Sequence, residues 1–135
     1  MIVADVNLIA YLLINGPFTS AARAALARDP HWIAPSLWRY EFLNILATSV
    51  RQKYLEEARA IVVWSNAPTF VQDTPIEPPP LEIFRLSVES RVATYDCTYV
   101  VLARRLSAPL ITADRKLVDQ FPDVAKSLED FAAGK

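Results

Sequence analysis

Glycine and cysteine are scarce in this chain of 135 residues. It has two glycines, Gly16 and Gly134, and one cysteine, Cys97. Two isolated glycines cannot build the glycine-rich loops that cradle nucleotide phosphates, so Walker-type and Rossmann-type cofactor sites are excluded. One cysteine excludes an internal disulfide and a multi-cysteine zinc site, which is typical of a reducing cytoplasm. We therefore expect Cys97 to serve packing.

Histidine is also scarce, and neither positive nor negative charge is in clear excess. His31 is the only histidine, and 14 lysines and arginines nearly balance 15 acids. A metal-free ribonuclease with two catalytic imidazoles is excluded, and no Ser-His-Asp or Cys-His pair is indicated, so we expect His31 at the surface or in packing. Without a polycationic arm, any contact with nucleic acid has to be local.

The first residues, MIVADVNLIAYLLI, are apolar but contain Asp5 and Asn7 and carry no basic leader. They fit neither a signal peptide nor a membrane span. The sequence therefore predicts a soluble cytoplasmic protein with no membrane partner.

Short β-branched runs alternate with helical patterns along the whole chain. By length, residues 1–135 are expected to form one domain with a single layered core. Strands are expected at 2–6, 31–34, 70–71 and 109–113, and helices at 8–14, 19–29 (capped by Thr19), 36–52, 55–65, 81–92, 94–106 and 115–121. This order predicts a parallel sheet covered on both faces, a three-layer α/β/α sandwich whose ligands gather at the carboxyl ends of the strands.

Four carboxylates stand at positions that favour a shared site. Asp5 and Asp114 end strand regions, Glu41 borders an apolar helix face, and Asp96 lies at the start of its helix. Helix capping would also explain Asp96 and Asp114, and a neighbouring arginine would explain Glu41. Asp5 is harder to explain, because a carboxylate in a buried strand needs several donors, a counter-ion or a raised pKa. If the four converge, oxygen-only ligands indicate Mg²⁺ or Mn²⁺.

The motifs VADVN, YEFLN, YDCTYVVLA and LITADRKL occur in the order seen in the PIN-domain ribonucleases, which the chain resembles from Ile2 to about Phe131. Its length and spacing are most similar to the VapC-type toxins of bacterial toxin-antitoxin pairs. The resemblance implies a PIN-like sheet of about five parallel strands and Mg²⁺-dependent hydrolysis of RNA. It implies catalytic and metal-binding roles for Asp5, Glu41, Asp96 and Asp114, and supporting roles for Asn7, Asn44 and Thr112. The proline-rich stretch IEPPP is a departure from the family pattern.

The same resemblance implies partners. Exposed apolar surface on the helices after Glu41 would serve a homodimer and a groove for a VapB-like antitoxin, whose arginine could enter the acidic site. For RNA contact, Arg115 and Lys116 are favoured because they follow Asp114, and Arg39 is next; ordinary solvated charges are an equally open interpretation of each. The three tryptophans are expected to pack rather than to stack on bases.

Other classes remain open on the sequence alone. A phospho-acceptor receiver and an aspartate-nucleophile phosphatase also place aspartates at strand ends. A receiver normally has an acidic pair there and the phosphatase a second aspartate two residues on, where this chain has Asn7. A non-catalytic PIN-like module in RNA processing is the third alternative.

Overall fold

A computed structural model describes residues 1–135 and shows a five-stranded sheet in the order β3-β2-β1-β4-β5. Every neighbouring pair of strands is parallel. The strands are Ile2–Ala4 (β1), Trp32–Ala34 (β2), Val71–Asp73 (β3), Leu110–Thr112 (β4) and Ala125–Ser127 (β5). The chain steps outward from β1 to β3 and then crosses back to β4 and β5, so the direction of winding reverses between β1 and β4.

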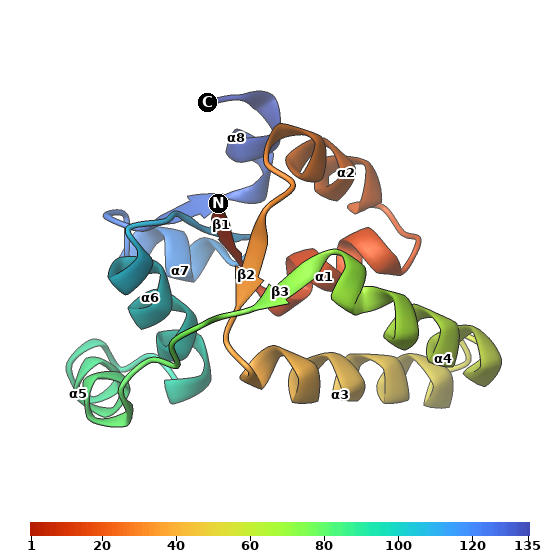
Figure 1. Ribbon diagram of the computed structural model, residues 1–135, viewed down its shortest axis with the longest axis horizontal. Coiled ribbons are helices and arrows are strands. Elements are labelled where there is room, and N and C mark those ends of the chain that lie inside the picture. Colours follow the sequence, from red (N-terminus) through yellow and green to blue (C-terminus); the bar gives the residue numbers. More distant parts are fainter.

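Helices cover both faces of the sheet, which confirms the predicted three-layer fold. Figure 1 shows α1 and α2 on one side of the sheet and α6 and α7 on the other. The helices are Val6–Leu13 (α1), Thr19–Arg28 (α2), Leu37–Arg51 (α3), Glu57–Asn66 (α4), Pro80–Ser90 (α5), Thr94–Leu106 (α6), Arg115–Gln120 (α7) and Leu128–Ala133 (α8), with a 3-10 turn at Ala67–Thr69. None of these helices is long and apolar enough to cross a membrane.

The core lies where the apolar strands meet the helices. Every residue of β1, β2 and β4 is buried, which is why these strands read as short continuous apolar runs. Trp32 and Trp38 are fully buried, and Trp64 packs against Trp38 with ring centroids 6.3 Å apart. The predicted packing role of the tryptophans is thus confirmed, as is that of the buried Cys97.

Some local predictions were wrong. Strand β5 and helix α8 were not assigned from the sequence, and the helix after β1 begins at Val6, where the strand was expected to continue. Thr19 does not cap α2, since Phe18 is the N-cap residue. Instead the buried Thr19 hydroxyl donates to the carbonyl of Tyr11 at 2.7 Å and accepts from the amide of Gly16 at 3.0 Å. It therefore holds the turn between α1 and α2.

Candidate functional site

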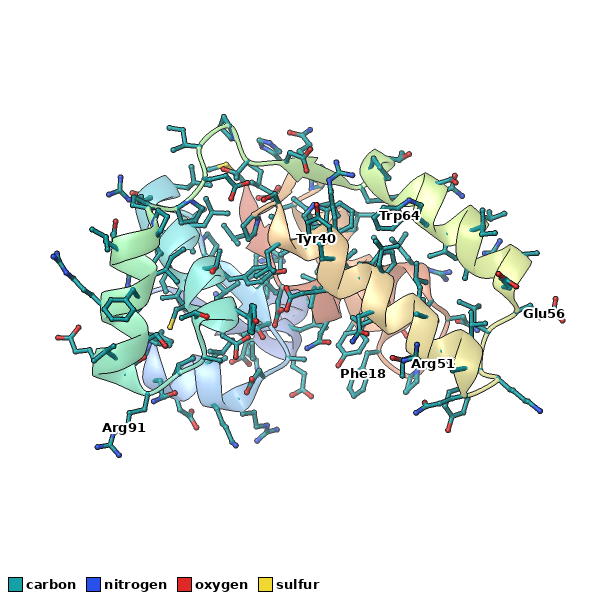
Figure 2. All side chains as sticks on the ribbon, turned by 90° about the horizontal axis from the view of Figure 1, so that it is seen from below. Phe18, Tyr40, Arg51, Glu56, Trp64 and Arg91 are labelled. Atoms are coloured by element: carbon teal, nitrogen blue, oxygen red, sulfur yellow. The ribbon has the colours of Figure 1, made fainter.

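The acidic side chains come from two strand ends and two helices. Asp5 follows β1 directly, and Asp114 stands two residues after β4, the neighbouring strand in the sheet. Glu41 lies in α3 and Asp96 in α6. Figure 2 shows the molecule from below and looks onto the edge of the sheet where the strands end. Helices α5 and α6 lie on one side of this view, and α3 and α4 lie on the other. This is the predicted position, beside the point where the winding reverses.

Asp5 is a buried carboxylate with one strong donor. Only 5% of the residue is exposed, and its Oδ2 accepts a hydrogen bond of 2.6 Å from the hydroxyl of Thr112. Burial raises the pKa of Asp5 to about 6; the Thr112 hydrogen bond and the amides of Val6 and Asn7 oppose this, and the charge of Asp96 adds to it. Asp5 is in no ion pair. The fold therefore keeps a carboxylate where its charge is poorly compensated by protein groups.

Glu41 is held by a residue that the sequence analysis did not identify. The buried Tyr99 hydroxyl donates to Oε1 of Glu41 at 2.7 Å. Burial raises the pKa of Glu41, the Tyr99 hydrogen bond lowers it, and the charges of Asp5 and Asp96 raise it further. Burial and the Glu41 charge also raise the pKa of Tyr99 far above its usual range, so its phenol remains a donor. The sequence feature that could have identified Tyr99 is its spacing, because Tyr99 lies one helical turn after Asp96 and so on the same side of the helix.

Asp96 and Asp114 differ in the way they are held. Asp96 lies in the first turn of α6, but Ala93 is the N-cap residue and no side chain caps this helix, so the capping interpretation of Asp96 was wrong. Burial raises the pKa of Asp96, and the charge of Asp114 adds to it. Asp114 does cap its helix, accepting from the amide of Lys116 at 2.9 Å, while its own amide donates to the Thr112 hydroxyl at 3.0 Å.

The four carboxylates are electrostatically linked. The charge of Asp96 raises the pKa of Asp5, the charges of Asp5 and Asp96 raise that of Glu41, and the charge of Asp114 raises that of Asp96. None is in an ion pair with a basic side chain. No three acid, histidine or cysteine side chains lie close enough to hold one ion in this arrangement. The donor set still fits Mg²⁺ or Mn²⁺, since it consists of carboxylate oxygens around a buried Asp5 that no cation of the protein neutralises.

The supporting residues fall into two groups. Thr112 is fully buried and links Asp5 to the backbone of Asp114, as a supporting residue would. Asn7 and Asn44 are exposed, and their side chains make no hydrogen bond within the protein. They remain available to a ligand rather than holding the carboxylates.

The basic candidates also differ. Arg39 pairs with Asp73 at 2.8 Å and lies over the ring of Trp38 at 5.3 Å from its centroid. Arg115 and Lys116 are exposed and in no ion pair, directly after Asp114. Of the three, Arg115 and Lys116 are therefore the side chains free to meet a phosphate, and Arg39 has a partner of its own.

Three other basic side chains contact neighbouring residues of the scaffold. His31 is exposed, as expected, and meets the side chain of Gln72 at 3.0 Å. Arg104 forms a two-point ion pair with Asp123, and Arg105 pairs with Glu82.

The sequence matches the PIN domain family over residues 2–126, and the chain belongs to that family. It is similar to the protein named Ribonuclease VapC3 of Pyrobaculum aerophilum, with 27% identity over 134 residues that cover 90% of this chain and 95% of the relative. A crystal structure of the protein PAE2754 of the same organism shares the fold, with a TM-score of 0.77, 20% identity, and coverage of 98% of this chain and 86% of that one. The resemblance drawn from the four motifs is confirmed, and the family match and the name of the relative support the prediction of a nuclease that acts on RNA.

Proposed function

We propose that residues 1–135 form a single PIN-like domain that hydrolyses RNA phosphodiester bonds with Mg²⁺ or Mn²⁺, in the cytoplasm, as a VapC-type toxin. One observation carries the proposal most directly. Asp5 is 5% exposed, lacks a cationic partner, and interacts electrostatically with Asp96 and Glu41. Buried carboxylates that repel one another require a positive charge for full ionisation. A divalent cation would supply this charge, and an RNA phosphate bound to it would be the group that is hydrolysed.

The protein's own groups orient the acids. The Thr112 hydroxyl occupies Oδ2 of Asp5, and the Tyr99 hydroxyl occupies Oε1 of Glu41, which leaves Oε2 of Glu41 without a hydrogen bond. A cation bound here would neutralise phosphate charge and lower the pKa of water toward neutrality. Arg115 and Lys116 would contact the RNA backbone beside Asp114.

An apolar groove supports the proposed inhibition by an antitoxin. Helices α3 and α4 enclose an apolar groove of about 450 Å³. Its lining includes Leu43, Leu46, Val50, Ile61 and Trp64, of which Leu43 is 43% and Ile61 61% exposed. An amphipathic segment of a VapB-like partner would cover the exposed Leu43 and Ile61, and an arginine from it would neutralise the acidic site. The homodimer implied by the resemblance belongs to the same proposal, and sedimentation over a range of concentrations tests it.

A cleavage assay tests the activity. The purified chain is incubated with labelled RNA and Mg²⁺ or Mn²⁺, with and without chelator, beside Asp5→Asn and Asp96→Asn. We expect cleavage to leave 5′-phosphates and to disappear with chelator and in both variants. Asp123→Asn is the matched control, because Asp123 pairs with Arg104 away from the four acids, so its activity should be unchanged.

The alternatives give different outcomes in this assay. Cleavage that survives chelation or both substitutions would reject the metal-dependent reaction. A well-folded, inhibitor-free chain that cleaves no RNA would favour a non-catalytic PIN-like module. Labelling of Asp5 by a small phosphodonor would favour a receiver-like function.

A further inference from the structure

A second pocket lies beside Asp114, one of the four acids. It has a volume of about 530 Å³ and lies between the turn that joins α1 to α2 and the helices α7 and α8. Ala113 and Arg115 line it, and these residues flank Asp114. Tyr11 lines it too, and the pKa of Tyr11 is raised by burial and by the charge of Asp5. The pocket therefore lies beside Asp114 and within the electrostatic influence of Asp5, and its volume suits a small ligand such as a nucleotide.

One wall of this pocket is aromatic. The rings of Tyr11 and Phe18 lie 4.7 Å apart between centroids and are tilted by 34°. Phe18 is 46% exposed, and Figure 2 shows it at the edge of the molecule. The buried Thr19 hydroxyl fixes the turn through the carbonyl of Tyr11, so Phe18 is held in place although it is exposed. A fixed, exposed aromatic ring beside a nuclease site is suited to stacking on an unpaired base.

The other wall of the pocket carries charged side chains that have no ion-pair partner. Arg115 and three acids, Asp119, Glu129 and Asp130, line it, and none of the four side chains is in an ion pair. Three carboxylates repel a phosphate but accept hydrogen bonds from the N–H groups of a neutral base. Arg115 carries the only positive charge of the lining and stands beside Asp114. A nucleotide would thus enter base first, with its phosphate toward Arg115.

We propose that this pocket binds a guanine base of the RNA substrate next to the cleaved bond, with stacking on Phe18 and recognition by a carboxylate of Asp119, Glu129 or Asp130. Guanine is the base favoured by this chemistry, because its N1–H and exocyclic N2 amine present two parallel donors to the two oxygens of one carboxylate. The amines of adenine and cytosine offer a carboxylate one donor group on that edge. The inference rests on the proposed function and adds base selectivity to it.

Binding without catalysis tests the pocket. The full chain is titrated with guanosine, inosine and cytidine 5′-monophosphates in chelator and followed by calorimetry or NMR. Inosine lacks only the N2 amine of guanosine, so it should bind about tenfold or more weakly, as expected for the loss of a hydrogen bond to a charged group. Equal binding of all three nucleotides would overturn the proposal. Tighter binding of arginine amide than of guanosine monophosphate would overturn it as well and assign the pocket to a protein side chain.

Variants identify the groups involved. Phe18→Ala should weaken guanosine monophosphate binding by about tenfold, and Phe18→Trp should restore it, because stacking needs only an aromatic face. Phe84→Ala is the matched control, since Phe84 is a 58% exposed residue of α5 outside the pocket. At least one of Asp119→Asn, Glu129→Gln and Asp130→Asn should abolish the preference for guanosine over inosine. The proposal is overturned if all three retain it.

Cleavage then separates this inference from the proposed function. In an active preparation, replacing guanosine by inosine beside the cleaved bond should raise KM about tenfold at similar kcat, and the carboxylate variant that abolishes the preference in binding should remove that difference. A chain that cleaves no RNA but binds guanosine monophosphate selectively would refute the nuclease proposal and keep the pocket. Cleavage with no dependence on guanine and no selective nucleotide binding would refute the pocket and keep the nuclease.

Discussion

Replacing Asp5 by Asn should make the metal-free protein more stable at neutral pH. Asn has the same shape, and its amide oxygen can still accept the hydrogen bond that Thr112 donates to Asp5. It removes the charge, however, from a residue that is 5% exposed and has no ion-pair partner. Because a buried uncompensated charge opposes folding, a substitution at this proposed catalytic position is expected to stabilise the fold.

The size and sign follow from the pKa of Asp5, which is about 6 in the folded protein and 3.8 in the absence of the fold. Between these pH values the folded state holds more protons than the unfolded state, so the free energy of unfolding falls as pH rises. The difference between the two pKa values corresponds to about 3 kcal/mol in the free energy of unfolding, and the folded protein has lost this full amount above pH 6. Asp5→Asn should recover up to about that amount at pH 7, or about 10 °C in Tm, and almost nothing near pH 4.

Urea unfolding of wild type and Asp5→Asn at pH 4, 5.5 and 7, in chelator, measures this difference. Comparing the two proteins at each pH removes the common part of the contributions from Glu41 and Asp96, whose pKa values are also raised. Asp123→Asn should behave oppositely, since Arg104 lowers the pKa of Asp123 and its charge favours folding. A wild-type stability that does not fall between pH 4 and 7, or an Asp5→Asn variant less stable than wild type at pH 7, would refute the reasoning.

Further predictions concern the groups around Asp5. Tyr99→Phe should cost about 1–3 kcal/mol in urea unfolding and weaken Mg²⁺ binding in a titration, because Glu41 loses its donor; unchanged Mg²⁺ affinity would argue against a positioning role. Thr112→Val should raise the pKa of Asp5 further, which would shift the acidic limb of the pH–rate profile upward. Mg²⁺ at 100 times its Kd should raise the wild-type free energy of unfolding by about 2.7 kcal/mol, and Asp5→Asn by much less. Ile61→Arg should prevent capture of a VapB-like peptide while RNA cleavage persists, as measured by pull-down and cleavage in parallel.

The strands that the sequence marks most clearly are those whose burial is uniform, whereas of β3 only Val71 was expected and only Val71 is buried. All residues of β1, β2 and β4 are buried, so apolar runs mark them in the sequence. Strand β5 is Ala-Lys-Ser with two half-buried residues, and it exists because it pairs in register with β4 rather than because of its own composition. Its assignment therefore depends on tertiary contacts that no local pattern encodes.

A site residue could be predicted from the sequence where its charge is unexpected among apolar neighbours. It could not be predicted where two residues distant in the sequence form a contact and each fits its own local pattern. Asp5 stands out because a charge in an apolar run needs an explanation. The partnership of Tyr99 and Glu41 joins residues 58 positions apart, and each alone fits an ordinary helix pattern. Likewise Asp73, which had no assigned role, meets Arg39 only because β3 ends beside α3.

Asp96 and Asp114 show how a structural and a functional explanation can be separated. Both aspartates stand near helix starts, and capping would have explained each of them. Asp114 does accept the hydrogen bond from the amide of Lys116, so its position is accounted for without any ligand. Asp96 receives no such bond, is half buried, and is destabilised by the charge of Asp114. Local structure gains from the Asp96 carboxylate only a weak interaction with the dipole of α6, so we propose that the presence of Asp96 depends more on a bound cation than that of Asp114 does. Asp96→Asn should therefore cost Mg²⁺ affinity with only a small change in helix stability.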